Sequence, residues 1–279
     1  MNELHKTVVH KPVLMNEVLE YLNLKQGGVY LDVTFGSGGH TRAILDAAPD
    51  STVVSLDWDT HAIDTFGPDL VEQYGDRFIP IWANFGNMLP ALKKIGIAQF
   101  DGILADFGTS QVQIFEKAGF SVYKDTPLDM RMSPAHQRLT AAQVVNTFDE
   151  KTLREMFYQL GEEKHSKKIA QMIVQHRALT PFETTKQLAQ LVERCAPRSK
   201  SGGKIHPATR VFQALRMFIN HELDNITSFL AAAPKLLNPS GRLVCISFHS
   251  LEDRLVKQTF REMDQSGLVQ LINKKVVVA

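Results

Sequence analysis

Residues 27–40 read "GGVYLDVTFGSGGH", a short apolar run followed by an acid, a glycine-rich turn and a histidine. The apolar run predicts a buried strand, and the segment "GGHTRAILDAA" that follows has the three-to-four apolar spacing of a helix. A glycine-rich turn between a strand and a helix lets a ligand approach the backbone. This stretch therefore predicts a ligand-binding turn at the end of the first strand of an α/β fold.

The same alternation continues through the first hundred residues. Compact apolar runs predict strands at 51–57, 77–83 and 100–106, and amphipathic spacing predicts helices at 60–75 and 85–96. Strands that alternate with helices are joined by right-handed crossovers and form a parallel sheet. We therefore expect a mostly parallel sheet.

The pattern changes in the second half of the chain. Residues 133–205 contain no convincing strand and read as successive amphipathic helices. A long helical stretch at 207–237 then leads to "GRLVCISF" (241–248), which reads as a fifth buried strand. We expect one domain from residues 1–132 and 206–279 and an inserted all-helical domain at 133–205.

Composition excludes several classes of protein. The 31 Lys and Arg residues almost balance the 30 Asp and Glu residues, so bulk charge neither indicates nor excludes a nucleic-acid partner. Cys195 and Cys245 form no CxxC motif, which argues against a disulfide framework or a zinc site. No run approaches the roughly 20 apolar residues of a membrane span, and the first residues do not resemble a signal or an Arg-rich presequence. We expect a soluble protein in a reducing compartment.

Acids follow three of the predicted strands. Asp32, Asp57 and Asp106 each end a strand, and ligands of parallel sheets bind beyond the carboxyl ends of the strands. Asp57 comes about 20 residues after the glycine turn, a spacing at which an acid accepts hydrogen bonds from ribose hydroxyls. These features favour a cofactor that contains adenosine.

The glycine pattern distinguishes between such cofactors. It is Gly36-x-Gly38-Gly39 rather than GxGxxG, and Asp32 directly precedes the turn. A carboxylate there disfavours the pyrophosphate of a dinucleotide, whereas it favours the cationic sulfonium and ammonium of S-adenosylmethionine. A nicotinamide-dependent oxidoreductase remains the less favoured alternative.

Two further residues accompany this turn. We interpret His40, which opens the helix, as a cofactor contact rather than a proton-transfer group. Phe85 is either a flat surface for adenine or a core residue.

Longer motifs identify a family. "DVTFGSGGHT", "PLDMRM", "FQALR" and "SFHSLEDR" occur in this order along the chain. Together they resemble the bacterial 16S ribosomal RNA cytosine-N4 methyltransferases (the RsmH or MraW family). The resemblance implies a Rossmann-like class I methyltransferase that uses S-adenosylmethionine to methylate the N4 amine of a cytidine near the decoding site. It also implies that the cofactor contacts are Gly38, Gly39, His40, Asp57, Phe85, Asp106 and Gln113.

The chain departs from the family pattern after Asp106. Phe107, Thr109, Gln111 and Ile114 replace the usual residues, and the family usually continues beyond "LINKKVVVA". These departures motivate an alternative: a degenerate member that binds cofactor or rRNA without efficient turnover and acts in ribosome assembly.

Two acids are candidate catalytic groups. A carboxylate that accepts a hydrogen from N4 would localise the lone pair of this delocalised amine and stabilise its developing positive charge. Asp106 is the first candidate and Asp129, in "PLDMRM", is the second. The alternative role for Asp129 is a pair with Arg131 that fixes the loop, and Arg131 is also a candidate phosphate contact.

The target base must leave its stack to reach a pocket, and basic residues must then hold the RNA. The candidate substrate contacts are Arg131, Arg198, Lys200, Lys204, Arg210 and His249.

The motif Ser250-x-x-Asp253 predicts a helix start capped by Ser250. The absence of Gly-x-Ser-x-Gly argues against a hydrolase.

We assign RNA recognition to the helical insertion. The expected partner is small-subunit rRNA or the small ribosomal subunit, with no membrane and no metal. The expected location is the bacterial cytoplasm, with the mitochondrial matrix as the alternative.

Overall fold

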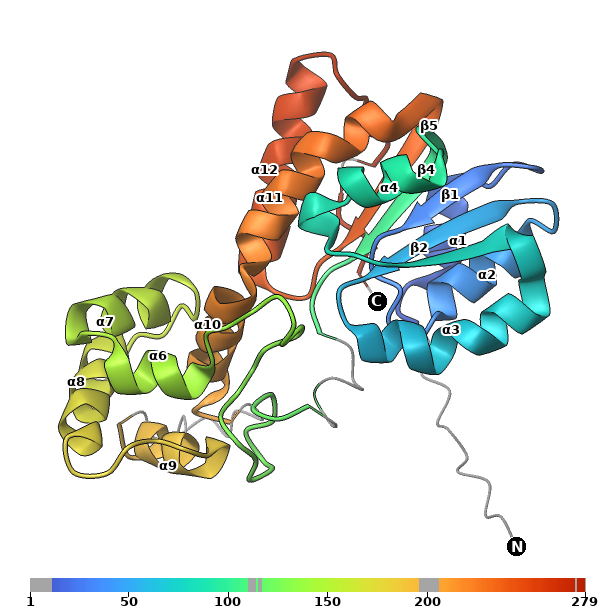
Figure 1. Cartoon of the computed structure of the whole chain (residues 1–279). Coiled ribbons are helices and arrows are strands. Elements are labelled where there is room, and N and C mark those ends of the chain that lie inside the picture. The colour runs from blue at the N-terminus through green and yellow to red at the C-terminus, as the bar shows by residue number, and fades with distance from the viewer. Residues whose placement is uncertain (1–11, 110–113, 115–116, 196–205, 274, 279) are drawn as a thin grey trace, which may run out of the picture. The chain divides into compact units, whose positions relative to one another are not determined.

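The structure is a computed structural model that describes residues 12–109, 114, 117–195, 206–273 and 275–278 (Figure 1). The chain divides into a sheet unit, Met1–Gly108 with Asp224–Ala279, and a helical unit, Thr109–Leu223. The helical unit is wider than the insertion expected at 133–205. The reason is that Leu128 and Met130, before the expected start, belong to the core of the helical unit, as do residues of the helix that follows the expected end.

The sheet unit contains a five-stranded sheet in the order β3-β2-β1-β4-β5. Every neighbouring pair of these strands is parallel, which confirms the expected parallel sheet. From β1 the chain adds β2 and β3 on one side and then β4 and β5 on the other, so the strand order reverses between β1 and β4. Sheets of this kind bind ligands in a crevice at the carboxyl ends of the two strands where the order reverses. The strands are β1 (Val29–Asp32), β2 (Thr52–Asp57), β3 (Phe78–Trp82), β4 (Phe100–Asp106) and β5 (Leu237–Ile246).

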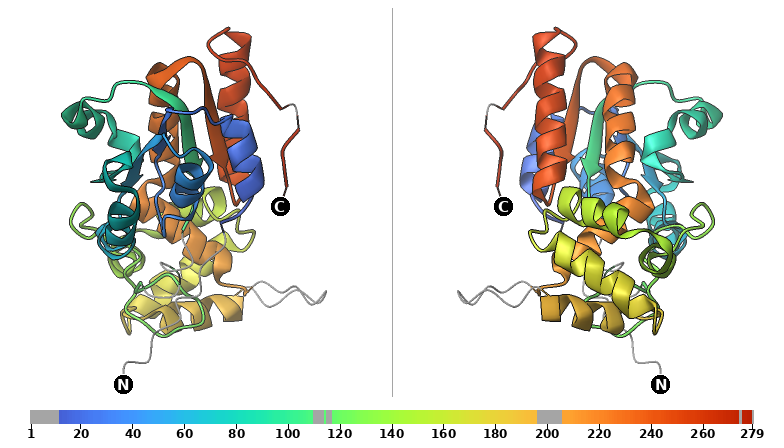
Figure 2. Two further views of the ribbon diagram at one scale, coloured as in Figure 1. Left: turned by 90° about the vertical axis from the view of Figure 1, so that its right-hand side faces the viewer. Right: turned by 90° about the vertical axis from the view of Figure 1, so that its left-hand side faces the viewer.

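Helices cover both faces of this sheet. α1 and α12 lie on one face and α11 lies on the other (Figure 2). The helical segments are α1 (Met15–Leu22), α2 (Gly39–Ala47), α3 (Thr60–Tyr74), η1 (Gly75–Arg77), η2 (Phe85–Asn87), α4 (Leu89–Ile95), α11 (Glu222–Ala232), η3 (Ala233–Leu236) and α12 (Ser250–Gln265).

The two outer strands explain two features of the sequence. β3 contains Pro80, which has no N–H to donate and is therefore tolerated at a sheet edge. β5 occupies the opposite edge, and most of its residues are only partly buried. The prediction of a fifth buried strand is wrong in this respect, because β5 has a strand partner on one side only among the described residues.

The long helical stretch predicted at 207–237 is interrupted. His221 has φ 51°, a left-handed conformation that ends α10 (Thr209–Asn220), and its N–H donates to the carbonyls of Met217 and Phe218. α11 begins at the next residue, Glu222. The stretch is helical, as predicted, but it is divided into α10, α11 and η3. The break at His221 has no glycine or proline signal in the sequence, because a single left-handed residue ends α10.

The helical unit has its own core. Thr140 forms a capping box with Gln143 at the start of the helix at 141–147, and Asp149 caps the helix at 150–159. The buried apolar residues of this core run from Leu128 to Ile219. The helices among its described residues are α6 (Ala141–Thr147), α7 (Glu150–Gln159), α8 (Ser166–Arg177), α9 (Thr185–Cys195) and α10. Among the described residues of both units, no helix is sufficiently long and apolar to cross a membrane.

Candidate active site

The candidate site lies at the carboxyl ends of the inner strands. Asp32 ends β1, Asp57 ends β2 and Asp106 ends β4, and these three strands are neighbours in the sheet. Parallel pairing places the three acids at the same edge, as the sequence predicts.

The glycine turn after β1 depends on backbone conformations that favour glycine. Gly36 has φ 54° and Gly38 has φ 78°. A Cβ on Gly38 would also lie 2.9 Å from the ring of Phe35, which is buried in the core of the sheet unit. These two glycines are therefore required by the turn itself.

Gly39 has a different explanation. A Cβ at this position would clash with the ring of Pro12, which lies against the start of α2. The sequence predicts Gly39 as a cofactor contact, and the structure adds a packing requirement that the motif alone does not reveal.

Asp32 is enclosed by protein donors. The side chain is 1% exposed, and it accepts from the Thr34 N–H at 3.1 Å, the Thr34 hydroxyl at 3.3 Å and the Thr41 hydroxyl at 2.7 Å. Burial raises the pKa of Asp32, while His40 and the hydrogen bonds from Thr41 and Thr34 oppose the rise. Asp32 therefore organises the turn and is almost inaccessible in this structure, and its contact with a cofactor stays a prediction.

Thr34 and Thr41 are residues that the sequence reasoning missed. Besides its bonds to Asp32, the Thr34 hydroxyl accepts from the Asp106 N–H at 2.7 Å and so connects the ends of β1 and β4. The Thr41 hydroxyl lies 2.7 Å from that of Ser55. Their position within "DVTFGSGGHT", next to the acid and the glycines, was the available signal.

Asp57 connects the turn after β1 to the end of β2. Its Oδ2 accepts from the Gly36 N–H and its Oδ1 accepts from the Asp59 N–H, both at 2.8 Å. Burial raises the pKa of Asp57 to about 6, against the opposing effect of these two hydrogen bonds. Each oxygen retains a further lone pair, so the carboxylate can accept from hydroxyl groups of a ligand.

His40 and Asp106 face each other at this edge. His40 Nε2 lies 3.6 Å from Asp106 Oδ2, beyond hydrogen-bond distance, with side-chain exposures of 7% and 23%. Both ring nitrogens of His40 and Oδ1 of Asp106 are buried without a hydrogen-bond partner among the described residues. These unpartnered atoms mark a polar site that a ligand can complete.

Phe85 belongs to an aromatic cluster. Its ring centroid lies 5.8 Å from that of Phe107 and 5.9 Å from that of Phe229 in α11. Phe107, one of the departures from the family pattern, is 2% exposed. The ring therefore packs in an aromatic cluster, as the core interpretation expects. It is only partly buried, and its contact with adenine stays a prediction.

In the helical unit, Asp129 and Arg131 form a bidentate ion pair. Arg131 Nε donates to Asp129 Oδ1 at 2.7 Å, and the second guanidinium nitrogen donates to Oδ2 at 2.8 Å. Arg131 also donates to the Gln137 carbonyl at 3.1 Å. This pairing with Arg131 lowers the pKa of Asp129 against the effect of burial. The geometry favours the loop-fixing alternative for both residues, since their polar atoms bind each other.

The same loop is anchored by Asn220, another residue that the sequence reasoning missed. Asn220 is fully buried, accepts from the Met132 N–H and donates to the Met130 carbonyl, each at 2.8 Å. Gln137 donates to Asn220 at 2.7 Å. A polar residue on the apolar face of α10 was the available signal.

The structure describes only some of the candidate RNA contacts. Arg210 is exposed on α10, and its guanidinium donates to the Glu162 carbonyl at 3.3 Å. Arg198, Lys200 and Lys204 lie outside the described residues, as does Gln113, which the sequence predicts as a cofactor contact.

His249 has a local role. Its side chain, rather than that of Ser250, caps α12 by accepting from the Glu252 N–H, so the predicted cap is wrong by one residue. His249 Nε2 also lies 3.1 Å from Oε1 of the fully buried Glu252. The imidazole takes the cap because its backbone is extended while Ser250 is already helical.

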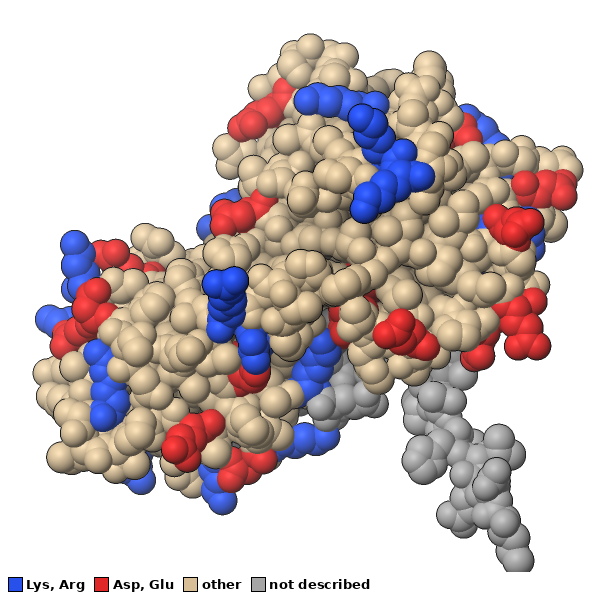
Figure 3. Space-filling model, in the orientation of Figure 1, with Lys and Arg blue, Asp and Glu red and all other residues tan. Residues whose placement is uncertain are grey.

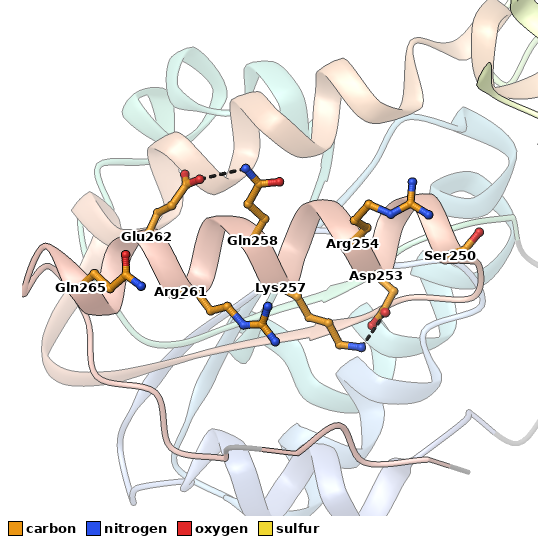
Figure 4. A pocket seen from close by; sticks show the side chains of 8 residues that line it. All are labelled: Ser250, Asp253, Arg254, Lys257, Gln258, Arg261, Glu262 and Gln265. Carbon is orange, nitrogen blue, oxygen red and sulfur yellow. Dashed lines mark hydrogen bonds and ion pairs between the residues drawn. The ribbon is translucent and has the colours of Figure 1, made fainter.

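A groove follows α12 but contains none of the predicted site residues. Asp253 pairs with Lys257 at 2.6 Å and Gln258 with Glu262 at 3.0 Å (Figure 4). Its lining is Ser250, Asp253, Arg254, Lys257, Gln258, Arg261, Glu262 and Gln265. A lining of mixed charge whose members pair with each other indicates a solvated helix face.

Comparison with known proteins agrees with this architecture. A sequence profile described as the MraW methylase family matches residues 7–277. The chain is similar to proteins named "Ribosomal RNA small subunit methyltransferase H". The one from Carboxydothermus hydrogenoformans is 47% identical over 90% of this chain and 80% of its own length. The one from Cyanothece sp. is 47% identical over 99% of this chain and 90% of its own length, and the one from Thermomicrobium roseum is 48% identical over 91% and 78%.

Proposed function

Because the chain belongs to the MraW methylase family, we propose that it methylates the N4 amine of a cytidine in small-subunit ribosomal RNA, with S-adenosylmethionine as the methyl donor. Its relatives carry the substrate in their name, small-subunit ribosomal RNA. The observation that carries the proposal is the set of unpartnered polar atoms of His40 and Asp106 at the switch point of the sheet. The protein would act where ribosomes are assembled, in the cytoplasm of a bacterium.

The residues at the strand ends suit this donor. S-adenosylmethionine has cationic groups and no phosphate, and the acids Asp57 and Asp106 favour positive charge. Asp57 would accept from the ribose hydroxyls, Phe85 would contact the adenine, and the turn at Gly38 and His40 would lie against the amino-acid end. When bound, S-adenosylmethionine supplies an electrophilic methyl group.

Asp106 would act on the amine. The N4 lone pair is delocalised into the pyrimidine ring, so the amine is a weak nucleophile. A carboxylate that accepts one N4 hydrogen localises the lone pair and stabilises the positive charge that develops on nitrogen. The product amine has one methyl in place of one hydrogen, and Asp106 accepts the displaced proton. Asp129, the second candidate, is better suited to fixing its loop through Arg131.

The RNA needs a positively charged surface. Arg210 is exposed on the helical unit, which we assign to RNA recognition. On the sheet unit, basic side chains gather over α4 and η3 (Figure 3), whose exposed lysines are Lys93, Lys94 and Lys235. Such side chains hold phosphates and leave the choice of base to the pocket.

The proposal is tested by methyl transfer. The protein is incubated with tritiated S-adenosylmethionine and small ribosomal subunits from a strain that lacks the modification, and the rRNA is digested to nucleosides. We expect tritium in N4-methylcytidine. Asp106→Asn should reduce incorporation by about 100-fold or more, on the scale of a lost general base. Asp101→Asn is the matched control, since Asp101 lies at the other end of the same strand.

The alternative, a degenerate member that binds without turnover, gives a different result. Calorimetry would then show binding of S-adenosylmethionine while no tritium enters the rRNA. Binding of NAD in place of S-adenosylmethionine would instead support the oxidoreductase.

A further inference from the structure

His40 and Asp106 are an incomplete pair at the candidate site. Their closest atoms, Nε2 and Oδ2, are 3.6 Å apart, and both ring nitrogens and Oδ1 have no hydrogen-bond partner among the described residues. A buried polar atom without a partner is energetically unfavourable. A shift of less than one ångström, on the order of ordinary side-chain motion, would bring Nε2 and Oδ2 within hydrogen-bond distance.

Asp32, the other acid near His40, does not compete for this role. Its two oxygens already accept from Thr34 and Thr41. Asp106 differs from Asp32. Its Oδ1 has no hydrogen-bond partner among the described residues, and its Oδ2 is approached by His40. Asp106 is therefore the acid to which the His40 imidazole can donate a hydrogen bond.

We propose that His40 is a positioning residue for Asp106: its Nε2–H donates to Oδ2 and thereby fixes Oδ1 as the acceptor for the N4 amine. This inference rests on the proposed function and revises one role in it: the turn at Gly38 still lies against the donor, whereas the His40 side chain acts through Asp106. A carboxylate held by one oxygen keeps a single orientation, and orientation of a reacting partner contributes to rate.

Several titratable groups surround this pair. Asp32 from β1 is the nearest further acid: burial raises the pKa of its carboxyl, His40 opposes the rise, and Asp106 adds to it. α1, which packs against α2, carries Glu17 and Glu20. Any pH profile of the reaction reflects these groups together.

The first test uses the full chain without donor or RNA. Nitrogen-15 NMR of histidine rings at a fixed neutral pH reports which ring nitrogen bears a proton and whether it is hydrogen-bonded. We expect the His40 Nε2 signal to show a protonated, hydrogen-bonded nitrogen, and Asp106→Asn to shift that signal. His61, exposed on α3, is the internal control and should not move. An His40 signal that is insensitive to Asp106→Asn would overturn the proposal whether or not the protein is a methyltransferase.

The second test separates positioning from donor binding. We expect His40→Ala to lower kcat by about 100-fold, comparable to loss of the base, while the KM for S-adenosylmethionine changes less than threefold. His40→Gln has an amide that donates from a similar position and should retain at least tenfold more activity than His40→Ala. The double variant with Asp106→Asn should be no slower than Asp106→Asn alone, because both residues act as one unit.

The outcomes of this second test are distinct. A raised KM for the donor with unchanged kcat in His40→Ala would make His40 a donor contact and overturn its positioning role. No transfer by the unaltered protein would defeat the proposed function, while the NMR result would still decide the His40–Asp106 pair.

Discussion

Asp57 shows how one partly buried side chain links structure to ligand binding. Its carboxylate holds the glycine turn through the Gly36 N–H and holds its own strand end through the Asp59 N–H. Burial nevertheless raises its pKa to about 6. The residue therefore has a structural role in either protonation state, and its capacity to accept ribose hydroxyls increases when it is ionised.

This pKa predicts a pH dependence with a defined sign. The folded protein binds more protons than the unfolded chain between about pH 4 and pH 6, so Asp57 makes folding less favourable as the pH rises through that window. Affinity for S-adenosylmethionine should change in the opposite sense and increase about tenfold from pH 5 to pH 7, as the ionised fraction grows.

The measurement uses the protein's own tryptophans. Trp58 directly follows Asp57, and the Trp82 indole donates to the Trp58 carbonyl at 2.9 Å. Both tryptophans of the chain therefore lie at the carboxyl ends of the strands, near Asp57. Fluorescence titration with S-adenosylmethionine should show the pH dependence in the unaltered protein and its absence in Asp57→Asn. An equal pH dependence in both proteins would exclude Asp57 as its source.

At the scale of elements, the start of α2 combines two requirements. Gly38 ends the turn with a positive φ, and Gly39 lets Pro12 pack against the first turn of the helix. Pro12 and the first turn of α2 thus pack against each other. This packing holds His40, the next residue of α2, at the candidate site.

We predict that Gly39→Ala destabilises the protein by about 1–3 kcal/mol, the usual cost of overpacking. The free energy of unfolding is measured by denaturant titration. Pro12→Gly in the same chain should recover at least half of the loss if the clash with Pro12 is the cause.

Gly67→Ala is the matched control. Gly67 lies inside α3 with open space around its Cα, so alanine should stabilise by about 0.5–1 kcal/mol through helix propensity. An effect of Gly39→Ala that Pro12→Gly does not relieve would contradict the packing explanation.

At the scale of the molecule, the described residues include a hydrophobic core in each unit, and these two cores share no residue. The core of the sheet unit draws on residues between Val18 and Ile246, and the core of the helical unit draws on residues between Leu128 and Ile219. The second is an uninterrupted part of the sequence placed within the first. Each unit therefore buries its own apolar surface.

This separation predicts a local response to the donor. Hydrogen–deuterium exchange with and without saturating S-adenosylmethionine should slow in β1, α2, β2 and β4, where the donor would bind. Stabilisation of the sheet unit should reach about 2.7 kcal/mol at 100 times the dissociation constant. Exchange in α7, α8 and α9 should stay unchanged, and equal protection of these helices would show that the units unfold as one.

The sequence by itself determined the parallel sheet, a run of helices between its fourth and fifth strands, and the side of the sheet on which Asp57 and Asp106 lie. These features follow from local periodicity and from the rule that parallel strands present their carboxyl ends together. Only the tertiary structure decided that Thr34 and Thr41 enclose Asp32, that Arg131 binds Asp129, and that His40 faces Asp106. The physical reason is that partnership between polar side chains depends on distances of a few ångströms and on rotamers. The packing of several elements sets both, whereas a motif records only residue type and spacing.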